Sequence, residues 1–492
     1  MLKEFRSLFK ETAVYGLSTV AGRLLNILLL PLYTHCLSRA EYGIVATVFA
    51  YIAFLNILYS HGMDLAFIRF GCPKGGDGGD PARDFSTPFW SIVGVAVALS
   101  ALIHVAAGPL AGLVGLAGWE SVIRYSAWIL ALDAAALVPF AELRLSHRAY
   151  AFVALKTVNI AAGLALNFVF VAKLGYGIEG VFLATLAASG LTLLTLLPSI
   201  ASKVRAVFDR KLHAELLAFA LPLLPAGLAA MTIQVADRPI LKALTDDATV
   251  GLYQANHKLA VIMMMAINMF EMAWRPFYTE QERSPKVKEL LARALTYFTV
   301  FTAFILVAVS LFLRDLVALP LLHGKPLIHP DYWVGLKVVP VVMLGYLLNG
   351  VYYNLNAPVT LAKRTELIAY ATAAGALASL AANALLIRVW GIMGAAAAVV
   401  VSYAAMSGAL LFFTRKVYPV AYEYRRLLHI GLVLAAVSAA ALFLRPDLKA
   451  GLLGWTLKLG LLAAFPAGLL ATGFLDEDER GAVRRAASGL LG

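Results

Sequence analysis

The sequence is poor in charge and in cysteine. Charged residues make up 14% of its 492 residues, whereas 61% are hydrophobic, and its mean hydropathy is +0.80. A soluble protein of several domains could not bury so much apolar surface, so the composition indicates a polytopic membrane protein. The two cysteines, Cys36 and Cys72, are too few for a metal site. The topology predicted below places them on opposite sides of the membrane, which excludes a disulfide.

The amino-terminal segment lacks the features of a cleavable signal peptide. Residues 1–10 are charged and amphipathic, and no small-residue cleavage site follows them, so we expect an interfacial helix that leads into the first span. The 41 lysines and arginines exceed the 29 acidic residues and give a net charge of +12. Basic residues collect on the cytoplasmic loops of membrane proteins, and this explains the positive net charge. We therefore expect no nucleic-acid partner.

Apolar stretches of spanning length recur along the whole chain. Crossing a bilayer takes about 20 helical residues, and the sequence contains about fourteen such spans. Lysines and arginines are more frequent in the loops on the side of the amino terminus, which predicts that both termini are cytoplasmic. The spans are expected at roughly 12–34, 42–68, 88–114, 122–143, 150–173, 178–198, 215–237, 250–274, 291–313, 335–358, 365–387, 392–414, 427–444 and 453–474.

Two short patterns repeat in the two halves of the chain. The segment 37–45 recurs in outline at 244–253, and a Gly-Ile-x-Gly motif occurs at 177–180 and again at 391–394. An even number of spans separates the copies, so they keep the same orientation in the membrane. We therefore expect an all-α fold of two pseudo-symmetric six-helix lobes plus two extra C-terminal helices. The predicted domains are 1–200 with helices 1–6, 201–416 with helices 7–12, and 417–492 with helices 13–14 and a cytoplasmic tail.

The first span carries Arg23 near its middle. An arginine at mid-depth costs on the order of 2.5–3.5 kcal/mol on insertion scales, so it needs a polar environment. Arg23 and Asn26 belong to a set of polar residues at i+3/i+4 spacing, which places them on one helix face. We expect this face to line a polar cavity. A structural ion pair of Arg23 with Asp64 or Asp133 is the alternative, and the sequence leaves it open.

Polar stripes on other spans predict further walls of an aqueous cavity. Lys156, Asn159, Gly163 and Asn167 align on helix 5, and the end of helix 7 carries Gln234, Asp237 and Arg238. Some polar residues of these spans also allow a purely structural interpretation. Lys258 can extend its charged end to the membrane interface, and the asparagines can form hydrogen bonds to neighbouring helices. The predicted substrate-binding residues are Arg23, Asn26, Lys258, His257, Asn159, Asn349, Tyr353 and Asn356. The predicted gating or ion-coupling residues are Gln234, Asp237, Arg238, Asn268, Glu271 and Arg275.

Three features together resemble the oligosaccharide and polysaccharide flippases of the multidrug/oligosaccharidyl-lipid/polysaccharide (MOP) exporter superfamily. They are the segment 24–51, the pair Asp237-Arg238 before residues 250–253, and the two Gly-Ile-x-Gly motifs. The resemblance implies a two-lobed transporter that moves undecaprenyl-diphosphate-linked oligosaccharides between leaflets by alternating access. The related lipid II flippases use basic residues of helices 1 and 8 at a central cavity. By position, the resemblance assigns these roles to Arg23 and Lys258.

The predicted function is therefore that of a flippase in the bacterial inner membrane, for O-antigen, capsule or exopolysaccharide synthesis. The expected partners are the lipid-linked oligosaccharide and membrane lipid, and the polymerase and chain-length proteins of the same pathway are candidates. No cofactor is expected. A proton or sodium ion is a candidate for coupling, with Glu271, Asp237 or His257 as its site.

The alternative functions are a drug or cation exporter of the same superfamily and a membrane-embedded polymerase or ligase. An enzyme is disfavoured because the predicted outer loops are small and the sequence contains no Ser/His/Asp cluster.

Overall fold

The computed structural model describes residues 22, 27–70, 80–322, 324–444, 451–475 and 479. The chain forms two compact units, each built from segments that are distant in sequence. Unit 1 draws on Met1–Leu259, Ile328–Val338 and Thr372–Ser402, and unit 2 draws on Ala260–Leu327, Val339–Ala371 and Tyr403–Gly492. These units are defined by contacts within the chain and not by the internal repeat. The predicted division into 1–200, 201–416 and 417–492 therefore stays a prediction.

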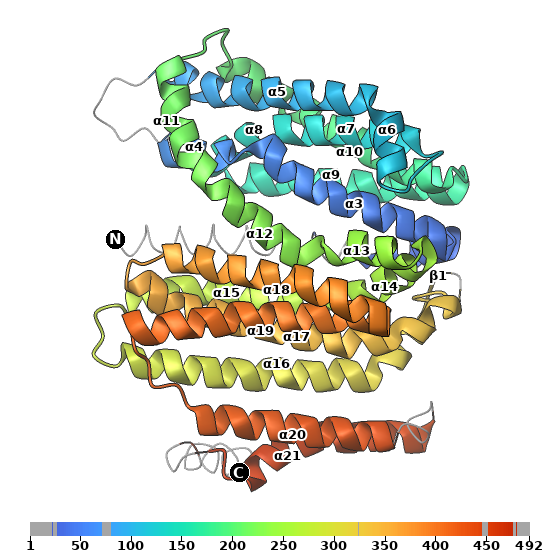
Figure 1. Cartoon of the computed structure of the whole chain (residues 1–492), viewed down its shortest axis with the longest axis vertical. Coiled ribbons are helices and arrows are strands. Elements are labelled where there is room, and N and C mark those ends of the chain that lie inside the picture. Colours follow the sequence, from blue (N-terminus) through green and yellow to red (C-terminus); the bar gives the residue numbers. More distant parts are fainter. Residues whose placement is uncertain are drawn as a thin grey trace. The chain divides into compact units, whose positions relative to one another are not determined.

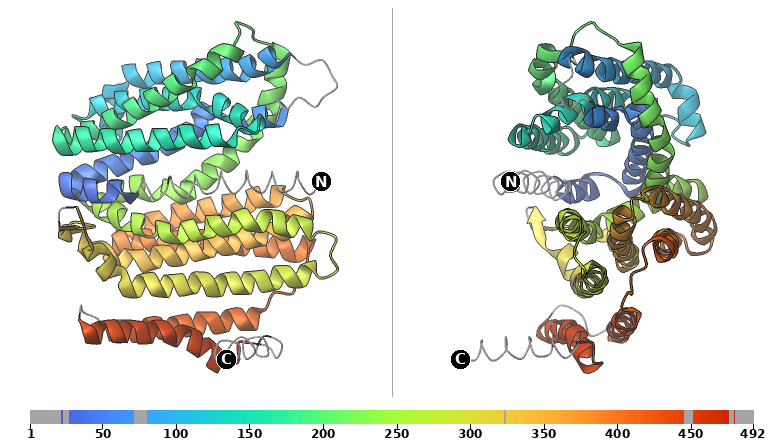
Figure 2. Two further views of the ribbon diagram at one scale, coloured as in Figure 1. Left: turned by 180° about the vertical axis from the view of Figure 1, so that it is seen from behind. Right: turned by 90° about the vertical axis from the view of Figure 1, so that its left-hand side faces the viewer.

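Unit 1 is helical throughout its described part, and α7, α9 and α10 pack side by side in it (Figures 1 and 2). Its elements are α2 (Leu29–Cys36), α3 (Arg39–Ser60), α4 (Met63–Phe70), α5 (Pro81–Val105), α6 (Ala107–Leu113), α7 (Glu120–Ala135), α8 (Leu137–Leu145), α9 (Ala149–Asn167), the π-helix η1 (Phe168–Lys173), α10 (Gly177–Lys203), α11 (Arg210–Ala220), η2 (Leu221–Leu223), α12 (Leu224–Val235), α13 (Asp237–Leu244), α14 (Asp247–Leu259) and η3 (Pro330–Lys337).

Unit 2 packs α20 and α21 against α16 around an apolar cluster that includes Val307, Val437 and Phe465. A short antiparallel hairpin pairs Pro320 with Pro326 and Leu322 with Lys325. The elements of this unit are α15 (Val261–Glu280), α16 (Val287–Ala318), β1 (Pro320–Leu322), β2 (Lys325–Pro326), α17 (Val338–Leu361), α20 (Tyr424–Phe443) and α21 (Leu452–Ala471), while α18 (Glu366–Trp390) and α19 (Ile392–Val417) contribute residues to both units.

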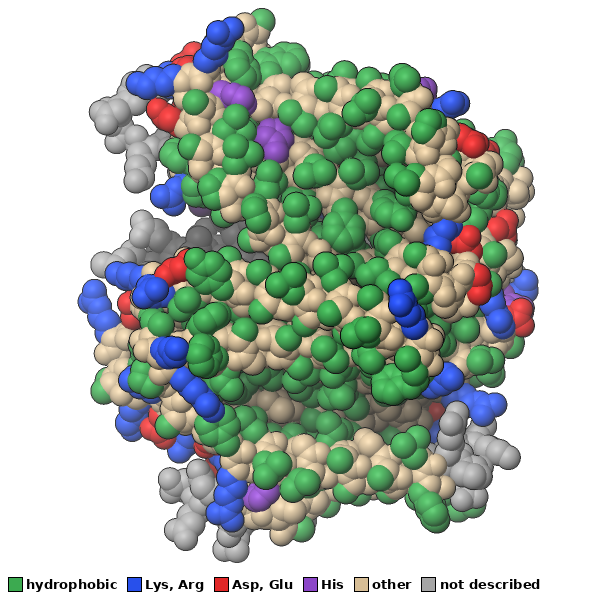
Figure 3. All heavy atoms as spheres, in the orientation of Figure 1, with side chains coloured by type: hydrophobic (Ala, Val, Ile, Leu, Met, Phe, Trp, Pro, Cys, Tyr) green, Lys and Arg blue, Asp and Glu red, His purple; other side chains and the backbone are tan. Residues whose placement is uncertain are grey.

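Twelve helices in the described part of the chain are long and apolar enough to cross a membrane. On the face shown in Figure 3, hydrophobic side chains cover the middle of the helices, and lysines and arginines lie mostly toward the helix ends. Two of the fourteen predicted spans are not among the twelve. The span 12–34 lies largely outside the described residues, and the span 250–274 is divided between α14 and α15 at Ala260. The chain is a multi-span, all-α membrane protein, as its composition predicts.

The two copies of the repeated segment meet at a pair of glycines in unit 1. A Cβ atom at Gly43 of α3 would lie 1.8 Å from the carbonyl oxygen of Asp247, and a Cβ atom at Gly251 of α14 would lie 1.9 Å from that of Arg39. No side chain fits at either position, so the two glycines allow the backbones of α3 and α14 to touch. The start of α3 is held by a capping box, in which the Ser38 hydroxyl accepts from the Glu41 backbone and the Glu41 carboxylate accepts from the Ser38 backbone.

Candidate functional site

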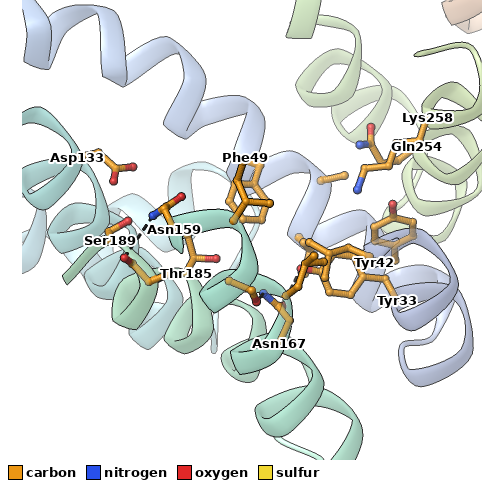
Figure 4. A pocket seen from close by; sticks show the side chains of 17 residues that line it. Tyr33, Tyr42, Phe49, Asp133, Asn159, Asn167, Thr185, Ser189, Gln254 and Lys258 are labelled. Atoms are coloured by element: carbon orange, nitrogen blue, oxygen red, sulfur yellow. Dashed lines mark hydrogen bonds between the residues drawn. The ribbon is translucent and has the colours of Figure 1, made fainter. Parts of the chain in front are cut away.

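A polar and aromatic pocket of about 460 Å³ lies within unit 1 (Figure 4). Its walls come from α2, α3, α7, α9, α10 and α14. The pocket therefore contains residues from both repeated halves of the chain. A volume of this size is typical of small-ligand sites. It is lined by Leu29, Tyr33, Tyr42, Val45, Ala46, Phe49, Asp133, Asn159, Ile160, Gly163, Leu164, Asn167, Thr185, Ala188, Ser189, Gln254 and Lys258.

One end of the pocket carries a lysine beside two tyrosine rings. The Nζ atom of Lys258 lies 5.5 Å from the ring centroid of Tyr33 and 5.8 Å from that of Tyr42. Among the described residues, no carboxylate forms an ion pair with Lys258 within 4.0 Å, and the neighbouring charge that acts on it is the cation Arg238. Ring faces attract an ammonium group, but they leave its full charge uncompensated. This end of the pocket therefore favours an anion.

The two tyrosines differ in how their hydroxyl groups are bonded. Tyr33 donates to Oδ1 of Asn167 at 2.8 Å, and Nδ2 of Asn167 donates to the Gly163 carbonyl oxygen at 2.8 Å. The π-helix η1 begins directly after Asn167, and such segments often occur at functional sites. The Tyr42 hydroxyl is buried and has no hydrogen-bond partner among the described residues. A buried hydroxyl without a partner is costly, so a ligand that bonds it would gain affinity.

The other end of the pocket carries a carboxylate. Asp133 of α7 lines this end together with Ser189 of α10, and the charge of Lys156 of α9 attracts it. Figure 4 shows Asp133, Asn159, Thr185 and Ser189 grouped at this end, away from Lys258. Nδ2 of Asn159 donates to the Thr192 hydroxyl and to the Ala188 carbonyl oxygen, so the amide is held in place by α10. This end therefore offers a fixed set of hydroxyl, amide and carboxylate groups.

A second polar cluster, the α13–α14 network, lies beside the pocket in unit 1. Arg238 is buried, and its Nη1 donates to Oδ1 of Asp237 at 2.8 Å. Its Nε donates to Oε1 of Gln254 at 3.0 Å. The Tyr253 hydroxyl donates to Oδ2 of Asp237 at 2.7 Å. Arg238 Nη1 also donates to the Gln234 carbonyl oxygen. The charges of Asp237 and Arg238 thus compensate each other, and Gln254 links this network to the pocket wall.

The network also determines which ring nitrogen of His257 carries the proton. Nη2 of Arg238 lies 3.1 Å from Nδ1 of His257. A guanidinium group can only donate, so Nδ1 accepts the bond, and the imidazole is neutral with its proton on Nε2. His257 is buried and does not line the pocket, although its neighbour Lys258 does.

The sequence matches a family model described as polysaccharide biosynthesis protein over residues 34–325. The chain belongs to this family. A comparison with curated proteins gave no significant match.

Solved structures share the fold of this polysaccharide biosynthesis family member. The lipid II flippase MurJ in an inward closed conformation superposes with a TM-score of 0.73 at 15% identity, covering 94% of this chain and 97% of that chain. An inward-facing MATE multidrug transporter of the MOP superfamily gives 0.63 at 13% identity, with 80% and 94% covered. The bent form of the Vibrio cholerae MATE transporter VcmN gives 0.53 at 13% identity, with 84% and 96% covered. At these identities the matches establish the fold, which is that of the MOP superfamily.

The predicted site residues of this family member fall into separate groups. Lys258 and Asn159 line the pocket, whereas Gln234, Asp237, Arg238 and His257 belong to the α13–α14 network. Arg23 and Asn26 lie outside the described residues. Their predicted roles, and the alternative ion pair of Arg23 with Asp64 or Asp133, stay predictions.

The remaining predicted residues lie in unit 2. Glu271 and Arg275 form an ion pair one turn apart on α15. Asn349 of α17 donates to the sulfur of Met264 at 3.6 Å. The rings of Tyr352 and Tyr353 lie 5.7 Å apart. Nδ2 of Asn268 and Oδ1 of Asn356 are buried without a hydrogen-bond partner among the described residues. Their predicted roles also stay predictions.

The sequence interpretation did not assign Tyr33, Tyr42, Thr185 and Ser189 to the site. Tyr33 precedes the repeated segment 37–45 and Tyr42 lies within it, and a tyrosine in an apolar span carries little information without its partner. Thr185 and Ser189 are spaced i, i+4 on α10, which places them on one face, but hydroxyl groups at this spacing are common in membrane helices. The stripe of Asn159, Gly163 and Asn167 on helix 5 does form one wall of the pocket.

Proposed function

We propose that this protein is a flippase for polyprenyl-diphosphate-linked oligosaccharides. The observation that carries the proposal is Lys258, a cation in the pocket wall that has no ion-pair partner among the described residues and lies beside two tyrosine rings. A diphosphate group supplies the missing negative charge, and the hydroxyl and amide groups farther along the pocket suit a sugar. The family match and the shared fold support the same assignment.

The shared fold also supports a carrier rather than an enzyme. MurJ is named as a lipid II flippase, and a MATE protein of the same fold is named as a multidrug resistance transporter. We propose that the diphosphate-sugar head enters the pocket from the cytoplasmic leaflet while the lipid tail stays in the membrane. Alternating access then releases the head on the other side. The polymerase and chain-length proteins of the same pathway stay candidate partners.

A drug or cation exporter is the second candidate, because Asp133 in the pocket wall would suit a cation. Lys258 in the same pocket opposes a cationic substrate, so we favour the anionic lipid-linked one. An ion-driven return step also belongs to the proposal, with a proton or sodium ion as the coupling ion. Asp237 and His257 lie in the α13–α14 network and Glu271 is paired with Arg275, so each candidate is bonded in this state.

The proposed location is the bacterial inner membrane with both termini in the cytoplasm. The excess of lysine and arginine in the loops on the amino-terminal side supports this orientation. We propose undecaprenyl-diphosphate-linked sugars as the substrate class at this location.

The test is to replace Lys258 by methionine, which keeps the length of the side chain and removes its charge. Purified protein is reconstituted in nanodiscs, and the affinity for undecaprenyl diphosphate is measured. We expect Lys258→Met to weaken binding about tenfold or more, because one charge-assisted contact is worth about 1.5–3 kcal/mol. Transport of a fluorescent undecaprenyl-diphosphate sugar into proteoliposomes should fall in parallel.

The control is Lys173→Met, because Lys173 is exposed and also lies near an aromatic ring, 5.9 Å from that of Phe168, but does not line the pocket. This variant should bind undecaprenyl diphosphate as the wild type does. Equal affinity of Lys258→Met and the wild type would disprove the proposed role of Lys258.

A further inference from the structure

The pocket of unit 1 carries opposite charges at its two ends. Of the described residues that line it, only Asp133 and Lys258 are charged, and Figure 4 shows Phe49 between them. A ligand that places a phosphate near Lys258 therefore extends toward a carboxylate. A phosphate ligand accounts for the presence of Lys258 in the pocket wall, but it does not account for the presence of Asp133.

The charge of Asp133 is only weakly compensated by its surroundings. The cation that acts on it is Lys156, and no ion pair within 4.0 Å joins the two side chains in the part of the chain that the structure describes. The Nζ atom of Lys156 instead lies 4.2 Å from the ring centroid of Phe140, outside the pocket wall. Among the described residues, no side-chain hydrogen bond within 3.5 Å reaches the Asp133 carboxylate, although the Ser189 hydroxyl interacts with it. A carboxylate has about four acceptor sites, so most of them can accept bonds from a ligand.

In the part of the chain that the structure describes, the pocket residues around Asp133 supply polar groups but no positive charge. Thr185 already donates to the Val181 carbonyl oxygen, and Asn159 donates to Thr192 and to the Ala188 carbonyl oxygen. Thr185 Oγ1 and Asn159 Oδ1 can therefore accept bonds from ligand hydroxyl groups. A ligand with several hydroxyl donors matches this wall, whereas a second carboxylate would meet Asp133 with the same charge.

We propose that Asp133 determines which sugar is accepted next to the diphosphate, and that this sugar is an uncharged, hydroxyl-rich ring. A uronic acid at this position is rejected, because like charges at close range in a partly buried site repel strongly. The inference rests on the proposed function, since it takes a diphosphate at Lys258 as the anchor of the ligand. It adds a specificity-determining residue and a substrate class that the family and the fold do not supply.

The experiment compares three probes on the purified full-length protein in nanodiscs. They are undecaprenyl diphosphate, undecaprenyl-diphosphate glucose and undecaprenyl-diphosphate glucuronic acid. The two sugars differ only at C6, where glucose has a hydroxymethyl group and glucuronic acid has a carboxylate. We expect the wild type to bind the glucose probe at least tenfold more tightly than the glucuronic acid probe.

The matched variants are Asp133→Asn and Asp64→Asn. Asparagine removes the charge of Asp133 and keeps its shape, so the preference should fall to about threefold or less, chiefly because the glucuronic acid probe binds more tightly. A gain of affinity for one probe cannot arise from a general loss of structure. Asp64 belongs to α4 in the same unit but does not line the pocket, so Asp64→Asn should keep the wild-type preference.

The outcomes separate this inference from the proposed function. Equal binding of the two sugar probes by the wild type overturns the role of Asp133 and leaves the diphosphate site intact. An unchanged preference in Asp133→Asn overturns it as well. Failure to bind any of the three probes contradicts the proposed function instead. The wild-type comparison needs no variant, so it decides the question even if Asp133→Asn fails to fold.

Discussion

His257 and Lys258 are neighbours on α14, but their side chains lie in contrasting environments. His257 is bonded to Arg238 in the α13–α14 network, where the charges of Asp237 and Arg238 cancel. Lys258 lines the pocket and has no ion-pair partner among the described residues. A compensated network stabilises a helix pair, whereas an uncompensated charge in a pocket binds a ligand. The comparison therefore contrasts a residue bonded within the fold with the residue that we propose as the anchor of the substrate.

The largest expected effect is on stability, from breaking the network at Asp237. Replacing Asp237 by alanine leaves Arg238 buried without its counter-charge, which should cost about 3–5 kcal/mol of unfolding free energy. The measurement is the denaturation midpoint of the detergent-solubilised protein. The control is Asp247→Ala on α14, because Asp247 pairs with Lys242 at 2.7 Å at a more exposed position. That pair should contribute about 1 kcal/mol or less. Equal losses from the two variants would contradict the buried network.

A smaller effect is expected from Tyr42→Phe in the pocket. The hydroxyl removed has no partner among the described residues, so stability should stay unchanged or rise by about 1 kcal/mol. Affinity for undecaprenyl diphosphate or its sugar should fall severalfold, because the hydroxyl is then unable to bond the ligand. Tyr33→Phe is the matched control, since it breaks the bond to Asn167 and should lower stability by about 1 kcal/mol. If both variants lose equal stability, the Tyr42 hydroxyl has a protein partner.

The smallest effect is expected at Asp209, which belongs to neither cluster. It caps α11, where its carboxylate accepts from the backbone of Lys211 and Leu212. The Leu212 backbone N–H first, and then those of Lys211 and the charge of Arg83, lower the pKa of Asp209 below its ordinary value of 3.8. Its contribution to stability is therefore present above pH 3.8 and is lost as the pH falls through the lowered pKa. The melting temperature of Asp209→Asn should lie slightly below that of the wild type at neutral pH and converge with it in acid. A constant difference would contradict the cap.

Periodicity along single helices predicted which residues share a helix face. The i, i+4 spacing of Asn159, Gly163 and Asn167 placed them on one face, and this face lines the pocket. The same reasoning placed His257 and Lys258 together as substrate-binding residues. Adjacent residues point about 100° apart around a helix, so one of them lies in the pocket wall and the other in the network.

Other features depend on contacts between distant segments. Tyr33 and Asn167 are separated by 134 positions, and their hydrogen bond places α2 against α9. The repeated segments 37–45 and 244–253 were recognisable from the sequence. That their glycines meet, with the backbones of α3 and α14 in contact, follows only from the packing of the two helices.

The sequence by itself determined that this chain is a multi-span helical membrane protein, because the hydropathy of each segment is a local property. It also determined which residues share a helix face. Only the tertiary structure decided which faces meet, that Lys258 lies beside Tyr33 and Tyr42, and that Asp133 lines the same pocket. The physical reason is that an ionisable residue in an apolar span must find a polar environment, and the partner that supplies it comes from elsewhere in the chain.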